Sequence, residues 1–302
     1  MPGLVALLLC AAPVRGQTVE DGTLLPKGAL GAGMVLTHET WDRYWEGSLK
    51  RGNENIGRLT TRSLTAMTGY GISDRLALLA MLPYVHTHAS RGTLKEMHGI
   101  QDVVVAAKYG LVTVPVAGRG TLKALAVGSI AVPAGDYSPD FLPLSIGLGS
   151  RRASGRVTLA FEARREWFLN ASAAYTWRSK VKLDRAAYYT GGQLHLGREV
   201  AMPDVFDYTL GGGYRGRRLH VPVSVSVQRT LGGSDIRRQD MPFVSNRMDF
   251  VRVEGGVGYT LPATNLMVRI GAARVVGGRN VGQATTLTGG FHYTLPLRTR
   301  AP

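Results

Sequence analysis

Hydrophobic and polar side chains alternate along many short stretches of this chain. The clearest stretch is 219–228, where leucine and valine occupy the odd positions while histidine, proline, serine and glutamine occupy the even ones. Successive side chains of a β-strand point to opposite faces, so this pattern predicts a strand with one apolar and one polar face. Pro222 lacks the N–H that a sheet ladder uses, and we expect a β-bulge there. Similar alternation is present in 102–111, 156–164, 167–176, 251–259 and 286–293.

The pattern predicts about twelve strands, an even number such as bacterial single-chain barrels have. The third and fifth strands alternate weakly, and in the third apolar residues follow one another from 78 to 82. The predicted strands are 30–45, 59–70, 75–86, 101–111, 121–132, 155–164, 167–178, 204–214, 219–230, 248–260, 265–276 and 283–295.

The connections between these segments are short and long in turn. Short connections are expected at 72–74, 112–120, 164–166, 215–217 and 262–264, and long ones at 46–58, 87–100, 133–154, 179–203 and 231–247, with 277–282 as a short exception. Periplasmic turns of outer-membrane barrels are short and extracellular loops are long, so both termini should lie in the periplasm.

Aromatic residues fall near both ends of the predicted strands, where the two interfacial belts of a membrane barrel would need them. Those near the short turns are Tyr70, Tyr109, Trp167, Tyr214, Tyr259 and Tyr293, and those near the long loops are Trp45, Tyr84, Trp177, Phe206 and Phe250. The predicted fold is therefore all-β, a closed antiparallel transmembrane β-barrel of about twelve strands in the outer membrane of a Gram-negative bacterium. Closure satisfies the backbone hydrogen bonds that lipid cannot satisfy.

The first residues form an apolar run, 4–12, that is too short to cross a bilayer as a helix and is typical of a signal peptide. We expect 1–16 to be removed and 17–302 to form the barrel. Cys10 is the only cysteine and lies in the part removed, so disulfides and thiolate chemistry are excluded from the mature protein. No later stretch has the ~20 consecutive apolar residues of a membrane-spanning helix.

Composition and charge narrow the expected partners. The 302 residues are 44% hydrophobic, with a formal net charge of +15. The cations are dispersed over many segments and no aromatic platform lies in a basic run, so we expect no nucleic-acid partner. Contacts with anionic lipopolysaccharide and a cationic lumen explain the charge more simply. Outer-membrane lipids and the barrel-assembly machinery are the other expected partners, with Tyr293 as the terminal aromatic for assembly.

Several short motifs resemble a known family. The motifs lie in 70–78, 82–85, 99–102, 107–111, 132–137 and 173–176, and include Tyr-Gly-Ile-Ser-Asp-Arg-Leu from Tyr70, Leu-Pro-Tyr-Val from Leu82 and Pro-Ala-Gly-Asp-Tyr from Pro133. This course resembles the outer-membrane family labelled the MetA pathway of phenol degradation. The resemblance implies a barrel related to FadL-type transporters of fatty acids and aromatic hydrocarbons, and it implies no established substrate.

Charged residues on the polar faces of the strands are the candidate site residues. A charged side chain facing lipid near mid-membrane costs about 2–4 kcal/mol, so these residues should line the lumen. They would either set selectivity for a polar or anionic solute or pair with each other and hold the barrel's shape. The candidates are Asp102, Lys108, Arg156, Glu162, Arg164, Arg178, Asp207, Arg252, Glu254 and Arg269.

The sequence is compatible with three functions. The first is passive transport or channelling of small hydrophobic or aromatic compounds, and the second is a structural or adhesion barrel whose loops do the work. The third is a lipid-acting enzyme at the rim, for which His86, His88 and His98 lie near Ser90 and Glu96. No nucleophile motif surrounds Ser90, so solvated loop histidines are favoured, and we expect no enzyme, cofactor or metal site.

Overall fold

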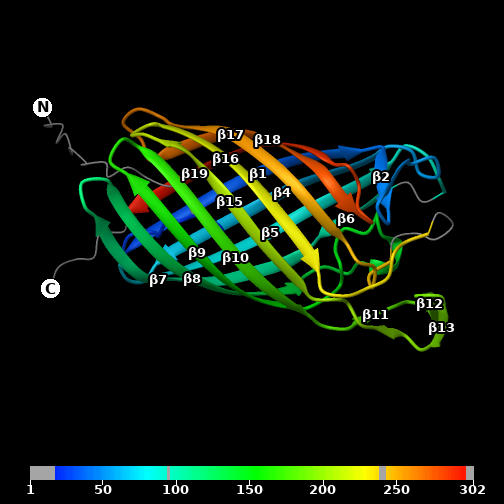
Figure 1. The fold of residues 1–302 in the computed structure, drawn as a ribbon. Coiled ribbons are helices and arrows are strands. Elements are labelled where there is room, and N and C mark those ends of the chain that lie inside the picture. Colours follow the sequence, from blue (N-terminus) through cyan, green and yellow to red (C-terminus); the bar gives the residue numbers. More distant parts are fainter. Residues whose placement is uncertain (1–17, 94–95, 238–242, 297–302) are drawn as a thin grey trace, which may run out of the picture.

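The computed structural model describes residues 18–93, 96–237 and 243–296, so the expected signal peptide, 1–16, lies outside the described residues. Twelve strands of this part form a barrel (Figure 1). They are β1 (Ala29–Trp41), β4 (Leu59–Gly71), β5 (Leu76–Ala89), β7 (Asp102–Val116), β8 (Gly120–Pro133), β9 (Arg152–Ala163), β10 (Trp167–Arg178), β15 (Val205–Arg215), β16 (Leu219–Thr230), β17 (Asp249–Thr260), β18 (Leu266–Arg279) and β19 (Thr285–Pro296).

Every neighbouring pair of these strands is antiparallel, and the sheet closes on itself. Pairing of β4 with β5 joins the two ends of the strand order, and β1 pairs with β19 from Ala29–Pro296 to Thr40–Thr285. The short strand β6 (Glu96–Ile100) continues the line of β7 along β5, so both occupy one position in the ring. The predicted closed barrel of twelve strands is thereby confirmed. Within the described residues, no helix has the length and apolar character needed to cross a membrane.

Three details of the prediction are wrong. The first strand ends at Trp41, and Trp45 belongs to a small hairpin, β2 (Arg43–Glu46) with β3 (Leu49–Gly52). Segment 112–116, expected as a connection, extends β7, so the turn is only 117–119. No register shift occurs at Pro222; the shifts lie between Gly110 and Val112 and between Val251 and Arg252.

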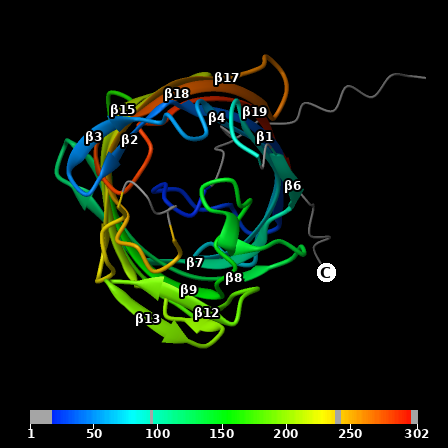
Figure 2. The ribbon, with the colours of Figure 1, turned by 90° about the vertical axis from the view of Figure 1, so that its right-hand side faces the viewer.

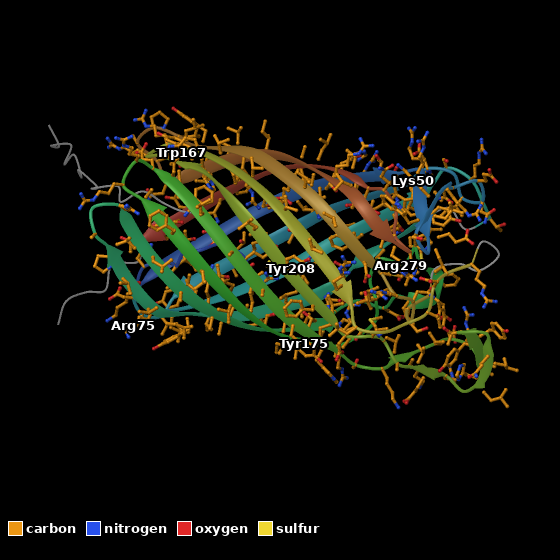
Figure 3. All side chains as sticks on the ribbon, in the orientation of Figure 1. Lys50, Arg75, Trp167, Tyr175, Tyr208 and Arg279 are labelled. Carbon is orange, nitrogen blue, oxygen red and sulfur yellow. The ribbon has the colours of Figure 1, made fainter. Side chains whose placement is uncertain are left out.

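The outer face of the barrel is apolar, as the alternation predicts. Large side chains that would be buried in a soluble domain are 55–71% exposed, namely Leu36, Leu169, Leu210, Val223 and Ile270. On the opposite face of β10, Phe168, Ser172 and Ala174 are buried. Figure 3 places Arg75 and Trp167 at the short-turn end, Lys50 and Arg279 at the long-loop end, and Tyr208 on the wall between them. Such an apolar wall is the surface of an outer-membrane barrel.

The aromatic belts are present with two exceptions, Trp45 and Phe250. Tyr70, Tyr109, Trp167, Tyr259 and Tyr293 are 41–59% exposed near the short turns, and Tyr84, Trp177 and Phe206 are 39–49% exposed near the long loops. Trp45 is buried instead, packed with Val275 and Ala284. Phe250, which pairs with Gln228 on the polar face of β16, packs against the same cluster.

The long loops form a layer of their own over one mouth of the barrel. Three short antiparallel ladders lie in it: β2–β3, β11 (Val181–Lys182) with β14 (Glu199–Val200), and β12 (Ala187–Thr190) with β13 (Gln193–Leu196). The β12–β13 hairpin projects beyond the mouth (Figure 1). Buried clusters join the loops, one of them around Leu142, Leu183 and Val244.

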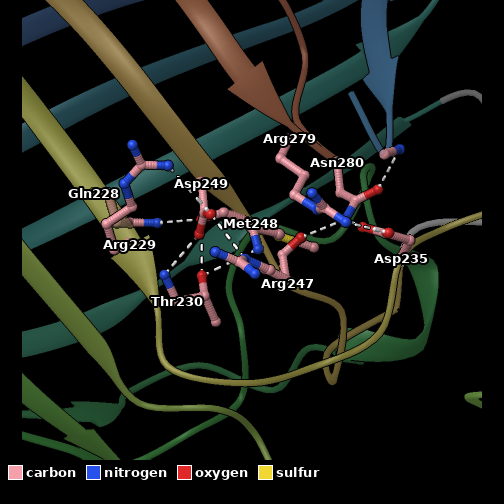
Figure 4. A network of polar contacts seen from close by, with 10 residues as sticks. Gln228, Arg229, Thr230, Asp235, Arg247, Met248, Asp249, Arg279 and Asn280 are labelled. Carbon is pink, nitrogen blue, oxygen red and sulfur yellow. Dashed lines mark hydrogen bonds and ion pairs between the residues drawn. The ribbon is translucent and has the colours of Figure 1, made fainter. Parts of the chain in front are cut away.

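Asn280 links three of these loops (Figure 4). Its amide oxygen accepts from the backbone N–H groups of Gly47 (2.7 Å) and Ile236 (3.1 Å), and its amide nitrogen donates to the Asp235 carboxylate (2.7 Å) and the Arg247 carbonyl (2.8 Å). The residue is buried and has φ of 56°, a left-handed conformation that asparagine tolerates better than most residues.

Candidate functional site in the barrel lumen

Two segments enter the ring of strands. Figure 2, a view along the barrel, shows the blue N-terminal stretch and the green loop after β8 inside the ring. We call residues 18–28 the N-terminal segment and residues 134–151 the inner loop. The inner loop contains the short 3-10 helix η1 (Pro139–Phe141).

Lys108 holds the N-terminal segment by charge. Its side chain is completely buried, and its ammonium group donates to the Thr18 carbonyl (2.8 Å), the Asp21 carbonyl (2.5 Å) and the Asp21 carboxylate (2.8 Å). An ammonium group has three N–H donors, so all of them are used by this segment. The predicted site residue Lys108 therefore anchors a lumen segment that the sequence alone did not reveal.

Apolar contacts hold the same segment against the inner wall. Val19 packs on a buried cluster of Leu79, Ala106 and Val127, which point inward from β5, β7 and β8. This contact explains why the third and fifth predicted strands, β5 and β8, carry apolar residues on both faces: lipid covers one face and the N-terminal segment covers part of the other. Weak alternation was thus the signal in the sequence for an internal segment.

Glycine allows the close approach of the segment to the wall. A Cβ at Gly71 would overlap the Pro26 carbonyl, and a Cβ at Gly22 would overlap the Ala160 side chain. The backbone N–H of Gly28 donates to the Gly71 carbonyl over 2.8 Å, just before β1 begins. The segment is therefore fitted to the lumen over most of its length.

A cavity of about 980 Å³ lies in the lumen on the short-turn side of the N-terminal segment. Its inner boundary includes Thr18 to Asp21, and its outer boundary includes the turn residues Arg164, Glu166 and Arg217. The walls come chiefly from β9, β10 and β15 to β19 and mix polar with apolar side chains, among them Asn170, Thr209, Ser224, Met267 and Thr288. A space of this size takes a small organic molecule.

The predicted site residues divide into two groups. Glu162, Arg164, Glu254 and Arg269 line the cavity. The others lie outside its lining: Asp102, Lys108, Arg156, Arg178, Asp207 and Arg252. Sequence reasoning did not pick out Glu20, Asp21, Arg215, Arg217 or Arg218, which also line it.

Ion pairs connect the inner charges. Arg156 contacts Asp207 at 2.6 Å and Glu20 at 3.6 Å, and its other terminal nitrogen donates to Ser172. Arg252 lies 3.5 Å from Glu254. These contacts agree with the alternative that lumen charges pair with each other.

Asp102 holds the inner loop rather than lining the cavity. Its buried carboxylate accepts hydrogen bonds from the Tyr137 hydroxyl and from Arg152, the latter at 2.8 Å. Burial and the hydrogen bond to Asp102 together raise the pKa of Tyr137 above its ordinary value, so the hydroxyl stays protonated and remains the donor. Leu144 and Ile146 of the loop accept from Thr87 and Gln101, each at 2.5 Å.

Arg178 lies at the long-loop end of β10, where its backbone N–H donates to the Asp204 carboxylate at 2.9 Å.

The rim histidines do not contact Ser90. His86 and His88 lie 3.4 Å and 3.9 Å from the Glu96 carboxylate, while the Ser90 hydroxyl oxygen accepts from the Arg58 backbone N–H at 2.8 Å. In the described part of the chain, no group of three or more His, Cys, Asp and Glu residues is placed to hold a metal ion.

The family model described as "Putative MetA-pathway of phenol degradation" matches residues 52–289, well over half of the chain. No curated protein matches the sequence. Among solved structures, the COG4313 outer membrane channel from Pseudomonas putida F1 is similar with a TM-score of 0.73 and 15% identity, covering 93% of this chain and 100% of that one.

Two further structures are less similar. The translocator domain of the autotransporter NalP from Neisseria meningitidis has a TM-score of 0.48 and 12% identity, covering 89% of this chain and 88% of that one. The Pseudomonas putida toluene transporter TodX has a TM-score of 0.40 and 11% identity, covering 90% of each chain. The similarity to the COG4313 channel confirms the fold of an outer-membrane barrel.

Proposed function

Since the chain belongs to the family described as the putative MetA-pathway of phenol degradation, we propose that it passes small hydrophobic or aromatic compounds passively across the bacterial outer membrane. The observation that carries the proposal is the cavity of about 980 Å³ inside a closed barrel. A closed barrel with a filled interior would have no room for a solute. The fold likeness to an outer membrane channel supports the same proposal.

The walls of the cavity suit a solute with an apolar body. Met267 and Pro222 supply apolar contacts, and Ser224 and Thr209 supply hydroxyl groups for a phenolic or similar polar substituent. Binding sites for small molecules combine a mainly apolar wall with a few polar groups in this way.

Flux through the full chain in liposomes tests the proposal. Toluene uptake should exceed that of protein-free vesicles, and Ser224→Trp should reduce it because the indole would fill the cavity. Val225→Trp is the matched control, since the same side chain one position along β16 would face lipid, where Val225 is 40% exposed. Uptake equal to that of protein-free vesicles, or equal loss in both variants, would end the proposal.

One observation favours the second candidate, an adhesion barrel. The projecting β12–β13 hairpin exposes Tyr189, Leu194 and Leu196 by 59%, 65% and 87%. Apolar groups at such a tip are typical of a contact surface. If adhesion is the function, Leu194→Asp with Leu196→Asp should abolish attachment of cells to an octyl-coated surface while toluene uptake is unchanged.

Lipopolysaccharide remains a proposed partner, and a row of basic side chains supports it. His38, Arg62, His86 and His98 are directly paired across β1, β4, β5 and β6, so they share one face of the sheet. Two residues further along each strand, toward the middle of the barrel wall, the same face carries a second row of paired residues. These are Leu36, Leu64, Tyr84 and Ile100, and all four are exposed. The basic row thus lies just outside the apolar wall, where lipid phosphates would be.

A further inference from the structure

Arginines outnumber acids in the turns at the short-turn end of the barrel. The turns 72–75, 117–119, 164–166 and 216–218 carry six arginines and two acids. The arginines are Arg75, Arg119, Arg164, Arg165, Arg217 and Arg218, and the acids are Asp74 and Glu166. All six arginines are exposed. Since this end is also where the cavity opens, the excess charge lies around the opening.

The deeper part of the lumen has no such excess. Four cations and four anions meet there: Lys108, Arg156, Arg252 and Arg269 with Glu20, Asp21, Asp207 and Glu254. At the mouth, five cations stand against two anions: Lys123, Arg164, Arg215, Arg217 and Arg218 with Glu162 and Glu166. The expected cationic lumen is therefore cationic at its mouth and balanced within.

Both acids of the mouth already have partners. Glu162 lies 2.8 Å from Lys123 and 3.4 Å from Arg215, and Glu166 accepts from the Tyr214 hydroxyl. Arg164, Arg217 and Arg218 line the cavity and form no ion pair within the described residues. Arg215 is fixed differently, with its guanidinium stacked 4.2 Å from the centre of the Phe168 ring. Three guanidinium groups at the opening are thus available to a solute.

We propose that this mouth binds small organic monocarboxylates with an apolar body in preference to neutral or cationic compounds of the same shape. The proposal rests on the proposed function, because it names the substrate class of the same cavity. A guanidinium group presents a planar pair of donors that matches a carboxylate. A cleft with low-dielectric walls and one sign of charge also raises the local concentration of the opposite ion.

The balanced interior fits the same substrate class. An anion drawn to the mouth meets no net opposing charge deeper in the cavity, and the apolar side chains of Pro222 and Met267 are available to its ring. Because the arginines are exposed, the preference should weaken as salt rises.

The test is equilibrium binding of benzoate to the full chain in detergent, with benzyl alcohol and benzylamine as neutral and cationic analogues. The variant Arg217→Gln with Arg218→Gln removes two of the three available guanidinium groups. The matched control, Arg75→Gln with Arg119→Gln, removes the same charge from turns at the same end that do not line the cavity.

We expect benzoate to bind more tightly than both analogues, and the Arg217/Arg218 variant to lose about three- to tenfold in benzoate affinity at low salt. Benzyl alcohol binding should not change, and the control should keep the affinity of the unaltered protein. Equal binding of benzoate and benzyl alcohol, or equal losses in variant and control, would overturn the inference. Toluene uptake is measured separately, so a barrel that passes toluene without preferring benzoate would contradict this inference alone.

Discussion

Lys108 and Asp21 form an ion pair at 2.8 Å inside the barrel, between β7 and the segment that precedes the first strand. The lysine side chain is completely buried and the aspartate side chain is 18% exposed. A buried charge is tolerated only when it is paired and hydrogen-bonded. Each residue therefore depends on the other, and the position of the N-terminal segment depends on both.

Replacing Lys108 with methionine should release the N-terminal segment. Breaking a buried pair by removing one partner typically costs about 3–5 kcal/mol, because the other charge stays buried without compensation. We expect a thiol introduced as Thr18→Cys to react faster with a water-soluble reagent, and single-channel conductance to rise. Lys123→Met is the control, since Lys123 pairs with Glu162 and does not contact the segment. Unchanged labelling and conductance would show that the pair does not hold the segment.

Replacing Asn280 with alanine should loosen the loop layer. The change removes the partners of the Gly47 and Ile236 N–H groups and of the Arg247 carbonyl, and a buried group left unsatisfied costs about 1–3 kcal/mol. Hydrogen exchange should accelerate at the Gly47 and Ile236 amides. Asn280→Gly accommodates the positive φ without the side chain, so equal acceleration in both variants assigns the effect to the amide group. Slow exchange in both would contradict the structure's account of this residue.

The contact between Asp235 and Arg279 in the loop layer should weaken only at low pH. The hydrogen bond from Arg279 holds the pKa of Asp235 below its usual value, with help from Asn280 and against a smaller opposing effect of burial. A carboxyl group with a lowered folded-state pKa contributes stability that is fully present above the unfolded value of about 3.9 and is lost as pH falls through the folded value. Protection of the loop amides from hydrogen exchange should therefore be lower in the Asp235→Asn variant than in the unaltered protein, by a constant amount from neutral pH to about pH 5. The difference should vanish below the folded-state pKa. A difference that disappears already near pH 6 would contradict this assignment.

Arg62 should matter for the lipid that accompanies the protein. In the proposed lipopolysaccharide site it is the permanently charged member of a row that also holds His38, His86 and His98. Arg62→Gln should lower the lipopolysaccharide that copurifies in mild detergent, measured by phosphate content. Arg75→Gln, at the opposite end of the barrel, should leave it unchanged. Equal phosphate in all three preparations would remove the support for this partner.

Alternation located most of the barrel strands, because a strand between lipid and a polar lumen must change polarity at each residue. It is weak in β5 and β8, whose inner faces carry apolar residues under the N-terminal segment. The alternation pattern gave a wrong strand end in β7, where the outward-facing positions change from odd-numbered to even-numbered residues. In β7, Tyr109 and Leu111 face outward, and so do Val112 and Val114, since the bulge after Gly110 shifts the register by one residue. Without that shift, the hydrophobic residues of 112–116 do not continue the alternation of 102–111, so the sequence predicts a connection there.

The candidate site was harder to predict than the fold. Inward charges such as Arg156 and Glu254 follow from strand parity, but their partners depend on which strands meet, which a single sequence does not give. Val19 and Asp21 belong to a segment with no regular structure and hence no period to detect. The predicted first strand wrongly includes Trp45, because the backbone bends at Asp42 and no glycine or proline marks that bend in the sequence.

The path of the chain at Gly28 has one more consequence. This residue ends the stretch inside the ring, and β1 begins immediately after it and joins β19, the last strand. The first and last strands meet at a seam, and residues 18–28 run from the lumen directly into the first of these two strands. The segment is therefore tethered at Gly28 to a strand that closes the barrel, so any movement of the segment out of the lumen must turn about that point.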